Sequence, residues 1–86
     1  MKQFSYIIKD ELGIHARPAG LLAKKAKSYA DTNVTITANG KTVNLGQLMK
    51  LMGLGVKQGT EVTVTCDGAN EDAACEGLLA FLEENL

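Results

Sequence analysis

Residues 13 to 19 of the chain read Gly13-Ile14-His15-Ala16-Arg17-Pro18-Ala19, and they mark a place where a loop turns into a helix. They hold the only histidine and the only proline of the sequence, and a run of leucine, alanine and lysine follows at once. Proline is tolerated in the first turn of a helix, because the N–H groups of that turn have no partners within the helix. We therefore predict that His15 is the N-cap of a helix that begins near Ala16.

This junction has the properties of an anion site. With His15 as the N-cap, the N–H groups of Ala16 and Arg17 point out of the helix end, beside the positive end of the helix dipole and the Arg17 guanidinium. An imidazole is nucleophilic near neutral pH and can carry a covalent group. The dipole would stabilise a phosphoryl group on His15 by about 0.3–1 kcal/mol without trapping it. On local physics alone, the alternative is a helix-capping or surface histidine beside a solvated arginine.

The rest of the chain alternates between strand and helix patterns. Apolar and polar residues alternate near the N-terminus, on both sides of Asn39-Gly40 and after Gly59, which is typical of half-buried strands. Asn39-Gly40 favours a two-residue hairpin, because both positions accept positive φ. Apolar stripes at helical spacing follow Pro18 and Asn70, which is a plausible N-cap. The predicted elements are strands at 3–8, 34–38, 41–45 and 59–66, and helices at 16–29, at 47–52 and from 71 onward.

The strand patterns also predict how the layers stack. One face of each strand carries valine, isoleucine or aromatic residues, and the other is rich in threonine and serine. This is typical of a sheet that helices cover on one side only. A helical crossover separates the first two strands, so they can run in the same direction with the last strand between them, antiparallel to both. We expect an α+β fold, an open-faced β-sandwich of order βαββαβα, with a four-stranded antiparallel sheet (1-4-2-3) and three helices on one face.

Length and composition indicate a single globular domain over residues 1–86. Hydrophobic residues make up 45% of the chain and charged residues 22%, as in ordinary soluble proteins. No apolar run is long enough for a signal peptide or a membrane span, so we expect a cytoplasmic protein. Cys66 and Cys75 fit no metal spacing, and one histidine cannot complete a zinc site with them. We expect free, buried thiols, no metal and no cofactor.

Charge is segregated along the chain, although the formal net charge is only −1. Every basic residue lies at or before Lys57, and the charged residues after it are all acidic. Nucleic-acid binding would require overall basicity or an aromatic-basic platform, and the sequence has neither. An acidic protein partner that docks near Arg17, Lys24 and Lys27 suits the pattern better. The alternative for these lysines is a solvated helix face.

Residues 13–19 resemble the active-site signature of the HPr family, the histidine phosphocarriers of the bacterial sugar phosphotransferase system. Gly59-Thr60-Glu61-Val62 and the turn at Gly68 match that family as well. The family's hairpin and second helix are similar to Asn39-Gly40-Lys41-Thr42-Val43-Asn44-Leu45 and Leu48-Met49-Lys50-Leu51-Met52-Gly53-Leu54-Gly55. Because these motifs stand in register along the whole chain, the resemblance outweighs the capping interpretation of His15.

The resemblance implies a phosphoryl-transfer intermediate rather than a turnover enzyme. His15 would accept a phosphoryl group on Nδ1 from enzyme I, itself charged by phosphoenolpyruvate. It would then pass the group to a histidine of a sugar-specific A-type component of the transporter. Arg17 would neutralise the phosphate charge and position the group for in-line transfer. The N–H groups of Ala16 and Arg17 would bind phosphate oxygens, and Pro18 would fix the turn.

The family's docking surface is an apolar patch around the second helix beside basic residues of the first. The residues implied here are Leu48, Met49, Met52 and Leu54, together with Gly20, Lys24, Lys27 and Lys50. The alternative for such a methionine-leucine stripe is core packing, and we expect half of the apolar side chains to point inward. Methionine suits a surface that meets several partners, because its side chain is flexible. We expect a monomer that does not insert into membranes.

The sequence departs from the family at one regulatory position. In many relatives from Gram-positive bacteria, a serine that begins the second helix is phosphorylated by an ATP-dependent kinase. Gln47 occupies this position here, after Gly46. Because glutamine has no hydroxyl group to phosphorylate, we predict no kinase control at Gln47 and no corepressor role that depends on phosphoserine.

Two other functions stay open from the sequence. One is a paralogue with the same chemistry in a regulatory or nitrogen-linked phosphotransferase chain. The other is a non-transferring protein-binding module, which the presence of both His15 and Arg17 disfavours, because recognition of shape needs neither. A hydrolase or metalloenzyme is disfavoured further. No motif places a second base or a carboxylate pair beside His15, although an aspartate or glutamate elsewhere could approach it in space.

Overall fold

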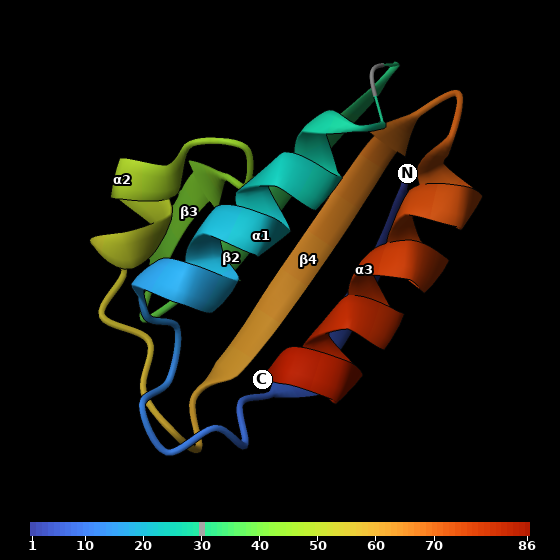
Figure 1. Cartoon of the computed structure of the whole chain (residues 1–86). Helices are drawn as coiled ribbons and strands as arrows, with labels where there is room; N and C mark the ends of the chain where they lie inside the picture. The colour runs from blue at the N-terminus through green and yellow to red at the C-terminus, as the bar shows by residue number, and fades with distance from the viewer. Residues whose placement is uncertain (30) are drawn as a thin grey trace.

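The computed structural model describes residues 1–86 except Ala30, and except the side chain of Leu48. The elements follow the predicted βαββαβα order (Figure 1). The first helix ends at Lys27, earlier than the predicted Tyr29, and the hydroxyl of the following residue, Ser28, donates to the Lys25 carbonyl oxygen. The bounds are β1 (Lys2–Ile7), α1 (Ala16–Lys27), β2 (Thr32–Ala38), β3 (Lys41–Asn44), α2 (Leu48–Met52), β4 (Glu61–Gly68) and α3 (Glu71–Asn85).

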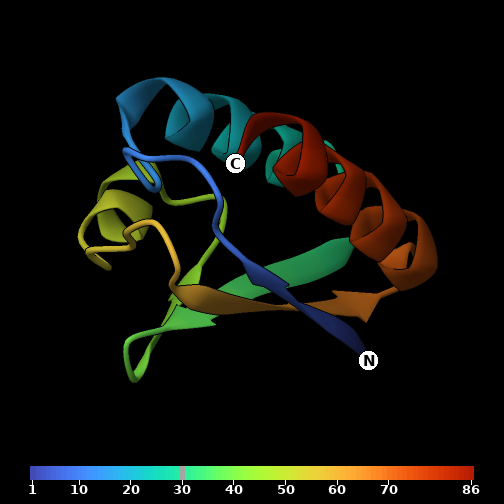
Figure 2. The ribbon, with the colours of Figure 1, turned by 90° about the horizontal axis from the view of Figure 1, so that it is seen from below.

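All four strands form one antiparallel sheet in the order β1-β4-β2-β3, which confirms the predicted topology. The central β4 pairs with β1, where Val64 faces Phe4, and with β2, where Val64 faces Ile36. Gly68 still pairs with Thr32 as the last residue of β4, so the turn predicted at this glycine begins one residue later. The three helices lie on one side of the sheet and leave its other face open (Figure 2).

The core lies between this sheet and the helices. The inward residues of β2 and β4 are buried at alternate positions, as the period of a strand dictates. They meet Leu22 of α1 and Leu78 and Leu82 of α3, each of which is completely buried. Burying one such side chain stabilises the fold by about 1.5–3 kcal/mol. The open face carries hydroxyl pairs instead, between Ser5 and Thr63 at 3.2 Å and between Thr37 and Thr42 at 2.7 Å.

The hairpin between β2 and β3 forms as predicted. Asn39 and Gly40 have φ values of 51° and 77°, the pair of positive angles that a type I′ turn requires. The Asn39 side-chain amide donates a hydrogen bond to the Leu54 carbonyl oxygen at 2.9 Å. This contact ties the hairpin to the segment that follows α2.

The N-terminus of α3 differs in detail from the prediction. Asn70 is the N-cap residue, but its side chain makes no capping hydrogen bond. Instead, the Asn70 N–H donates to the hydroxyl of Thr32, a buried residue at the start of β2, at 3.0 Å. Glu71 and Asp72 occupy the first turn as predicted. Acidic side chains there interact favourably with the positive end of the helix dipole. None of the described helices is long and apolar enough to cross a bilayer.

Candidate functional site

His15 is the N-cap of α1, as the sequence predicts. Its backbone is extended, with φ −117° and ψ 175°, and its carbonyl oxygen accepts the first bond of the helix from Ala19 N–H at 2.9 Å. Its side chain makes no capping hydrogen bond. The imidazole is 37% exposed. The ring is therefore available for chemistry instead of serving the helix.

The loop that carries His15 is pinned on both sides. Gly13 has φ +67°, and a Cβ atom there would lie 2.2 Å from the Val56 carbonyl oxygen. That oxygen accepts a hydrogen bond from Ile14 N–H at 3.2 Å. On the other side, the Lys9 and Asp10 N–H groups donate to a main-chain oxygen of Leu86 at 2.6 and 2.8 Å. Only glycine has both the conformational freedom and the small size that position 13 requires.

The groups predicted to attract an anion come together at this junction. Within the described residues, the N–H groups of Ala16 and Arg17 have no acceptor, and the Arg17 side chain is exposed without a carboxylate in ion-pair range. Pro18 is buried and lacks an N–H group. Arg17 and Pro18 line a depression of about 250 Å³ together with Asp10, His15, Leu21 and Asn85.

Two polar residues in this depression were missed by the sequence analysis. Asp10 Oδ1 lies 3.9 Å from His15 Nε2, so a carboxylate does approach the histidine, although no motif places it there. Asp10 could have been suspected from its place in the loop before Gly13. Asn85 reaches the site from the end of α3, where its amide donates to the Phe81 carbonyl oxygen at 3.0 Å. No local sequence signal connects Asn85 with His15.

The residues expected on a docking surface divide into four groups. Lys24, Lys27, Met49, Lys50 and Met52 are exposed, Met49 at 81% and Met52 at 39%. Gly20 is half-buried, and the side chain of Leu48 lies outside the described residues. The expectation for Leu54 is wrong: its side chain is 4% exposed and belongs to the core cluster. Hydrophobic pattern alone could not separate Leu54 from its exposed neighbours.

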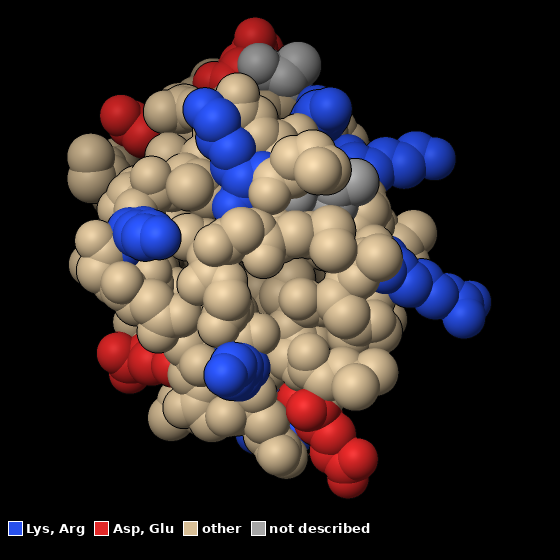
Figure 3. Space-filling model, turned by 90° about the vertical axis from the view of Figure 1, so that its left-hand side faces the viewer, with Lys and Arg blue, Asp and Glu red and all other residues tan. Residues whose placement is uncertain are grey.

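One exposed apolar residue was missed. Leu21 of α1 is 49% exposed, one residue beyond Gly20 and at the rim of the depression that holds His15. Figure 3 shows the side of the molecule that faces left in Figure 1, where α2 lies. On it, basic side chains surround a continuous uncharged area, and acidic groups stand at its margin. We call Leu21, Lys24, Lys27, Met49, Lys50 and Met52 the basic-apolar surface.

Gln47 is the N-cap of α2 and is exposed. Its side chain makes no capping bond. Its backbone N–H donates to the Asn44 carbonyl oxygen at 3.0 Å, and its own carbonyl oxygen accepts from Leu51 N–H at 2.9 Å. The position is thus accessible but carries an amide instead of a hydroxyl group.

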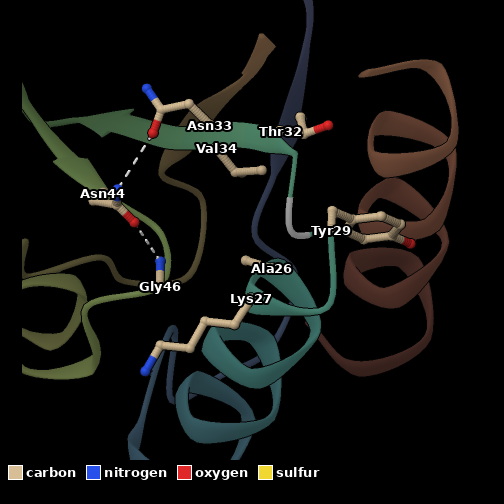
Figure 4. A pocket seen from close by; sticks show the side chains of 8 residues that line it. All are labelled: Ala26, Lys27, Tyr29, Thr32, Asn33, Val34, Asn44 and Gly46. Atoms are coloured by element: carbon tan, nitrogen blue, oxygen red, sulfur yellow. Dashed lines mark hydrogen bonds between the residues drawn. The ribbon is translucent and has the colours of Figure 1, made fainter. Parts of the chain in front are cut away.

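A second cavity, of about 190 Å³, lies between the end of α1 and the β2–β3 pair (Figure 4). Its amide groups are already engaged. Asn44 accepts from Gly46 N–H at 2.8 Å and donates to the Asn33 side-chain oxygen at 3.4 Å. Neither His15 nor Arg17 lines this cavity, so it is separate from the depression that holds His15.

The two cysteines are free. Cys66 is completely buried on β4, and Cys75 on α3 is only half-buried, so the expectation of buried thiols is confirmed for Cys66 alone. Burial, together with the neighbouring Cys75 thiol, raises the pKa of Cys66 to about 12. The Cys66 thiol is therefore protonated and unreactive at neutral pH. In the described part of the chain, no three metal-binding side chains come together.

An open-faced sandwich that presents a histidine and an arginine at the start of its first helix defines a class of small phosphoryl carriers. The family model described as PTS HPr component phosphorylation site matches residues 2–84. The chain belongs to the HPr family, the phosphocarriers of the phosphotransferase system, which are not turnover enzymes.

Similarity to individual proteins agrees with this assignment. The chain is 45% identical over 78 residues to phosphocarrier protein HPr of Mycoplasma capricolum, covering 91% of this chain and 86% of the relative. A solved mycoplasma histidine-containing phosphocarrier protein is 41% identical, with TM-score 0.92 over 96% of this chain and 93% of that one. Crh of Bacillus subtilis, a catabolite repression protein solved as a domain-swapped dimer, is 36% identical, with TM-score 0.77 over 100% and 98%.

Proposed function

We propose that His15 is the phosphoryl acceptor of this carrier. Its Nδ1 lone pair attacks the phosphorus atom of the group that phosphoenolpyruvate has placed on enzyme I. The new N–P bond forms as the bond between phosphorus and the donor breaks. In the second transfer, the His15 N–P bond breaks as a histidine of a sugar-specific A-type component takes the phosphoryl group. The observation that carries the proposal is the partly exposed imidazole at the N-cap of α1, beside two N–H groups without acceptors.

The neighbouring groups have separate tasks. The Ala16 and Arg17 N–H groups would bind phosphate oxygens, and the helix dipole would add its modest attraction. The Arg17 guanidinium would neutralise charge that develops during in-line transfer. Pro18 fixes the first turn without needing an acceptor for an N–H group. Each hydrogen bond to a charged phosphate is worth about 1.5–3 kcal/mol. A few such bonds hold the phosphoryl group on His15 and still allow its transfer to the next protein.

The basic-apolar surface is the proposed docking site for both donor and acceptor. Its lysines would steer acidic partners, and its methionines would adapt to different partner shapes. We propose that the protein acts in the cytoplasm as a monomer of one domain over residues 1–86. We also propose that it escapes kinase control at Gln47, because that side chain has no hydroxyl group.

Incubation with enzyme I and phosphoenolpyruvate tests the assignment of His15. We expect one acid-labile phosphate on His15, found by mass spectrometry, and none on a folded His15→Ala variant. A phosphate that maps elsewhere, or none where a known HPr is phosphorylated under the same conditions, would overturn the assignment. A second incubation, with an HPr kinase and ATP, should leave the Gln47 segment unmodified.

The alternative is a paralogue in a regulatory or nitrogen-linked phosphotransferase chain; a regulatory protein, the catabolite repression protein Crh, is among the similar structures. Such a paralogue would use the same chemistry at His15 but would pass the phosphoryl group to different proteins. Transfer from the phosphorylated protein to purified sugar-specific A-type components separates the two functions. Rapid transfer supports the sugar-uptake role, and the absence of transfer to all of them supports the regulatory role.

A further inference from the structure

A carboxylate stands beside one nitrogen of His15. Asp10 Oδ1 lies 3.9 Å from His15 Nε2, and the two side chains are 31% and 37% exposed. We propose that Asp10 is a positioning residue that keeps the imidazole proton on Nε2, so that the Nδ1 lone pair is available to accept the phosphoryl group. This inference deepens the phosphocarrier function proposed above and rests on it.

The Asp10 carboxylate is held in place by hydrogen bonds within its own loop. Its Oδ1 accepts from Leu12 N–H at 2.8 Å, and its backbone carbonyl oxygen accepts from Gly13 N–H at 3.0 Å. Its own N–H donates to a main-chain oxygen of Leu86 at 2.8 Å. An aspartate that bonds to the N–H two residues on forms a local turn with a defined side-chain direction. Asp10 is therefore preorganised, with its carboxylate beside the imidazole.

The chemistry of imidazole gives this placement a consequence. A neutral imidazole has one N–H group, and the partner of one nitrogen selects which tautomer is present. A carboxylate near Nε2 favours a proton there and leaves Nδ1 as the acceptor of the N–P bond. When that bond forms, positive charge spreads over the ring, and the Nε2–H group becomes a stronger donor toward Asp10.

The other groups in the depression cannot replace Asp10 in this role. Arg17 carries only donors, and the Asn85 amide, whose nitrogen donates to the Phe81 carbonyl oxygen, has no negative charge to attract an N–H group. Asp10 is the one carboxylate among the residues that line the depression. Since 3.9 Å exceeds hydrogen-bond length, the interaction is electrostatic before phosphorylation, and we expect it to shorten when the ring becomes charged.

Asp10→Asn is the informative variant, because it removes the charge and keeps an oxygen that Leu12 N–H can bond. The readout is the ¹⁵N NMR spectrum of the imidazole in the unphosphorylated protein, at a pH where the ring is neutral. We expect the wild type to hold its proton mainly on Nε2 and Asp10→Asn to shift it measurably toward Nδ1. Unchanged Leu12 and Gly13 amide signals would show that the loop is intact.

Glu11→Gln is the matched control, because it removes an exposed charge from the next residue of the same loop. It should leave the tautomer ratio unchanged. Equal ratios in wild type and Asp10→Asn would overturn the proposal, as would an equal shift in Glu11→Gln. In transfer assays, Asp10→Asn should accept phosphate about tenfold more slowly, the scale of one hydrogen bond to a charged group.

Failure of this inference is distinguishable from failure of the phosphocarrier function. If enzyme I does not phosphorylate the wild type at His15, the proposed function fails, whatever the tautomer ratios are. If enzyme I phosphorylates wild type and Asp10→Asn at equal rates and the tautomers are equal, only the role of Asp10 fails.

Discussion

At the scale of single residues, the site combines a nucleophile with a cation that forms no ion pair with the described residues. Arg17 is exposed and has no carboxylate in ion-pair range among the described residues. Its guanidinium therefore contributes little to folding and retains its full capacity to bind phosphate. The same separation of roles applies to His15, whose backbone begins α1 while its ring makes no capping bond.

Arg17→Ala should slow phosphoryl transfer far more than it changes stability. Loss of hydrogen bonds worth about 1.5–3 kcal/mol predicts a fall in the transfer rate of about 10- to 100-fold. The melting temperature should stay close to that of the wild type. Rapid-quench kinetics with enzyme I measure the rate, and Lys41→Ala, which removes an exposed cation from β3, is the control. A wild-type rate in Arg17→Ala would remove Arg17 from the mechanism.

Cys66 should make stability depend on pH in the alkaline range. Its pKa is about 12 in the fold against 9.0 for an ordinary thiol. Between these values the unfolded chain has lost the proton and the folded chain keeps it, so stability falls as pH rises. The slope should be about 1 kcal/mol per pH unit. Urea unfolding at about pH 10 and pH 11 measures it, and Cys66→Val should lack this part of the slope.

At the scale of elements, the His15 loop depends on contacts with segments distant in sequence. Gly13 packs against the Val56 carbonyl oxygen, and the Lys9 and Asp10 N–H groups both reach Leu86 at the end of α3. The helix start is encoded locally, but the direction in which His15 faces is set by these two anchors. A change in either anchor should therefore disturb the site without touching His15.

Gly13→Ala and Gly20→Ala should change stability in opposite directions. Alanine at position 13 would have φ +67° and clash with Val56, which predicts a loss of about 1–3 kcal/mol. Gly20 lies within α1, and a Cβ atom there would meet nothing within 4 Å, which predicts a gain of about 0.5–1 kcal/mol. Denaturant unfolding of both variants tests this. Equal stability of Gly13→Ala and wild type would contradict the role of Gly13 as an anchor.

The elements were largely predictable because their signals are local. The alternation of apolar and polar residues predicted the strands. Asn39-Gly40 predicted the hairpin, and Pro18 predicted the start of α1. What the sequence could not supply were contacts made through space. Asp10 beside His15 depends on how one loop folds, and the burial of Leu54 depends on how the segment after α2 packs onto the core.

At the scale of the whole molecule, one face combines exposed basic and apolar side chains. Figure 3 shows basic groups around an uncharged area, and α2, with its exposed methionines, contacts α1, which carries the exposed Lys24 and Lys27. An apolar centre with a charged rim is the usual anatomy of a transient protein interface. Because this surface borders the depression of His15, a partner that docks there can meet the imidazole directly.

Met49→Ala and Leu54→Ala should separate docking from folding. Met49 is 81% exposed, so its truncation should weaken binding to enzyme I by about tenfold and change stability by less than about 0.5 kcal/mol. Leu54 is buried, so its truncation should cost about 2–5 kcal/mol of stability. Calorimetric titration and thermal melting measure the two effects. Wild-type affinity in Met49→Ala would exclude that residue from the interface.

The position of β4 has a consequence for how the protein folds during its synthesis on the ribosome. This strand lies between β1 and β2 but is the last of the four to be synthesised. Until it emerges, β1 has no neighbour with which to pair, and neither Val56 nor Leu86 can restrain the loop of His15 until translation reaches them. A nascent chain should therefore be inert as a phosphoryl acceptor until β4 and Leu86 have been translated.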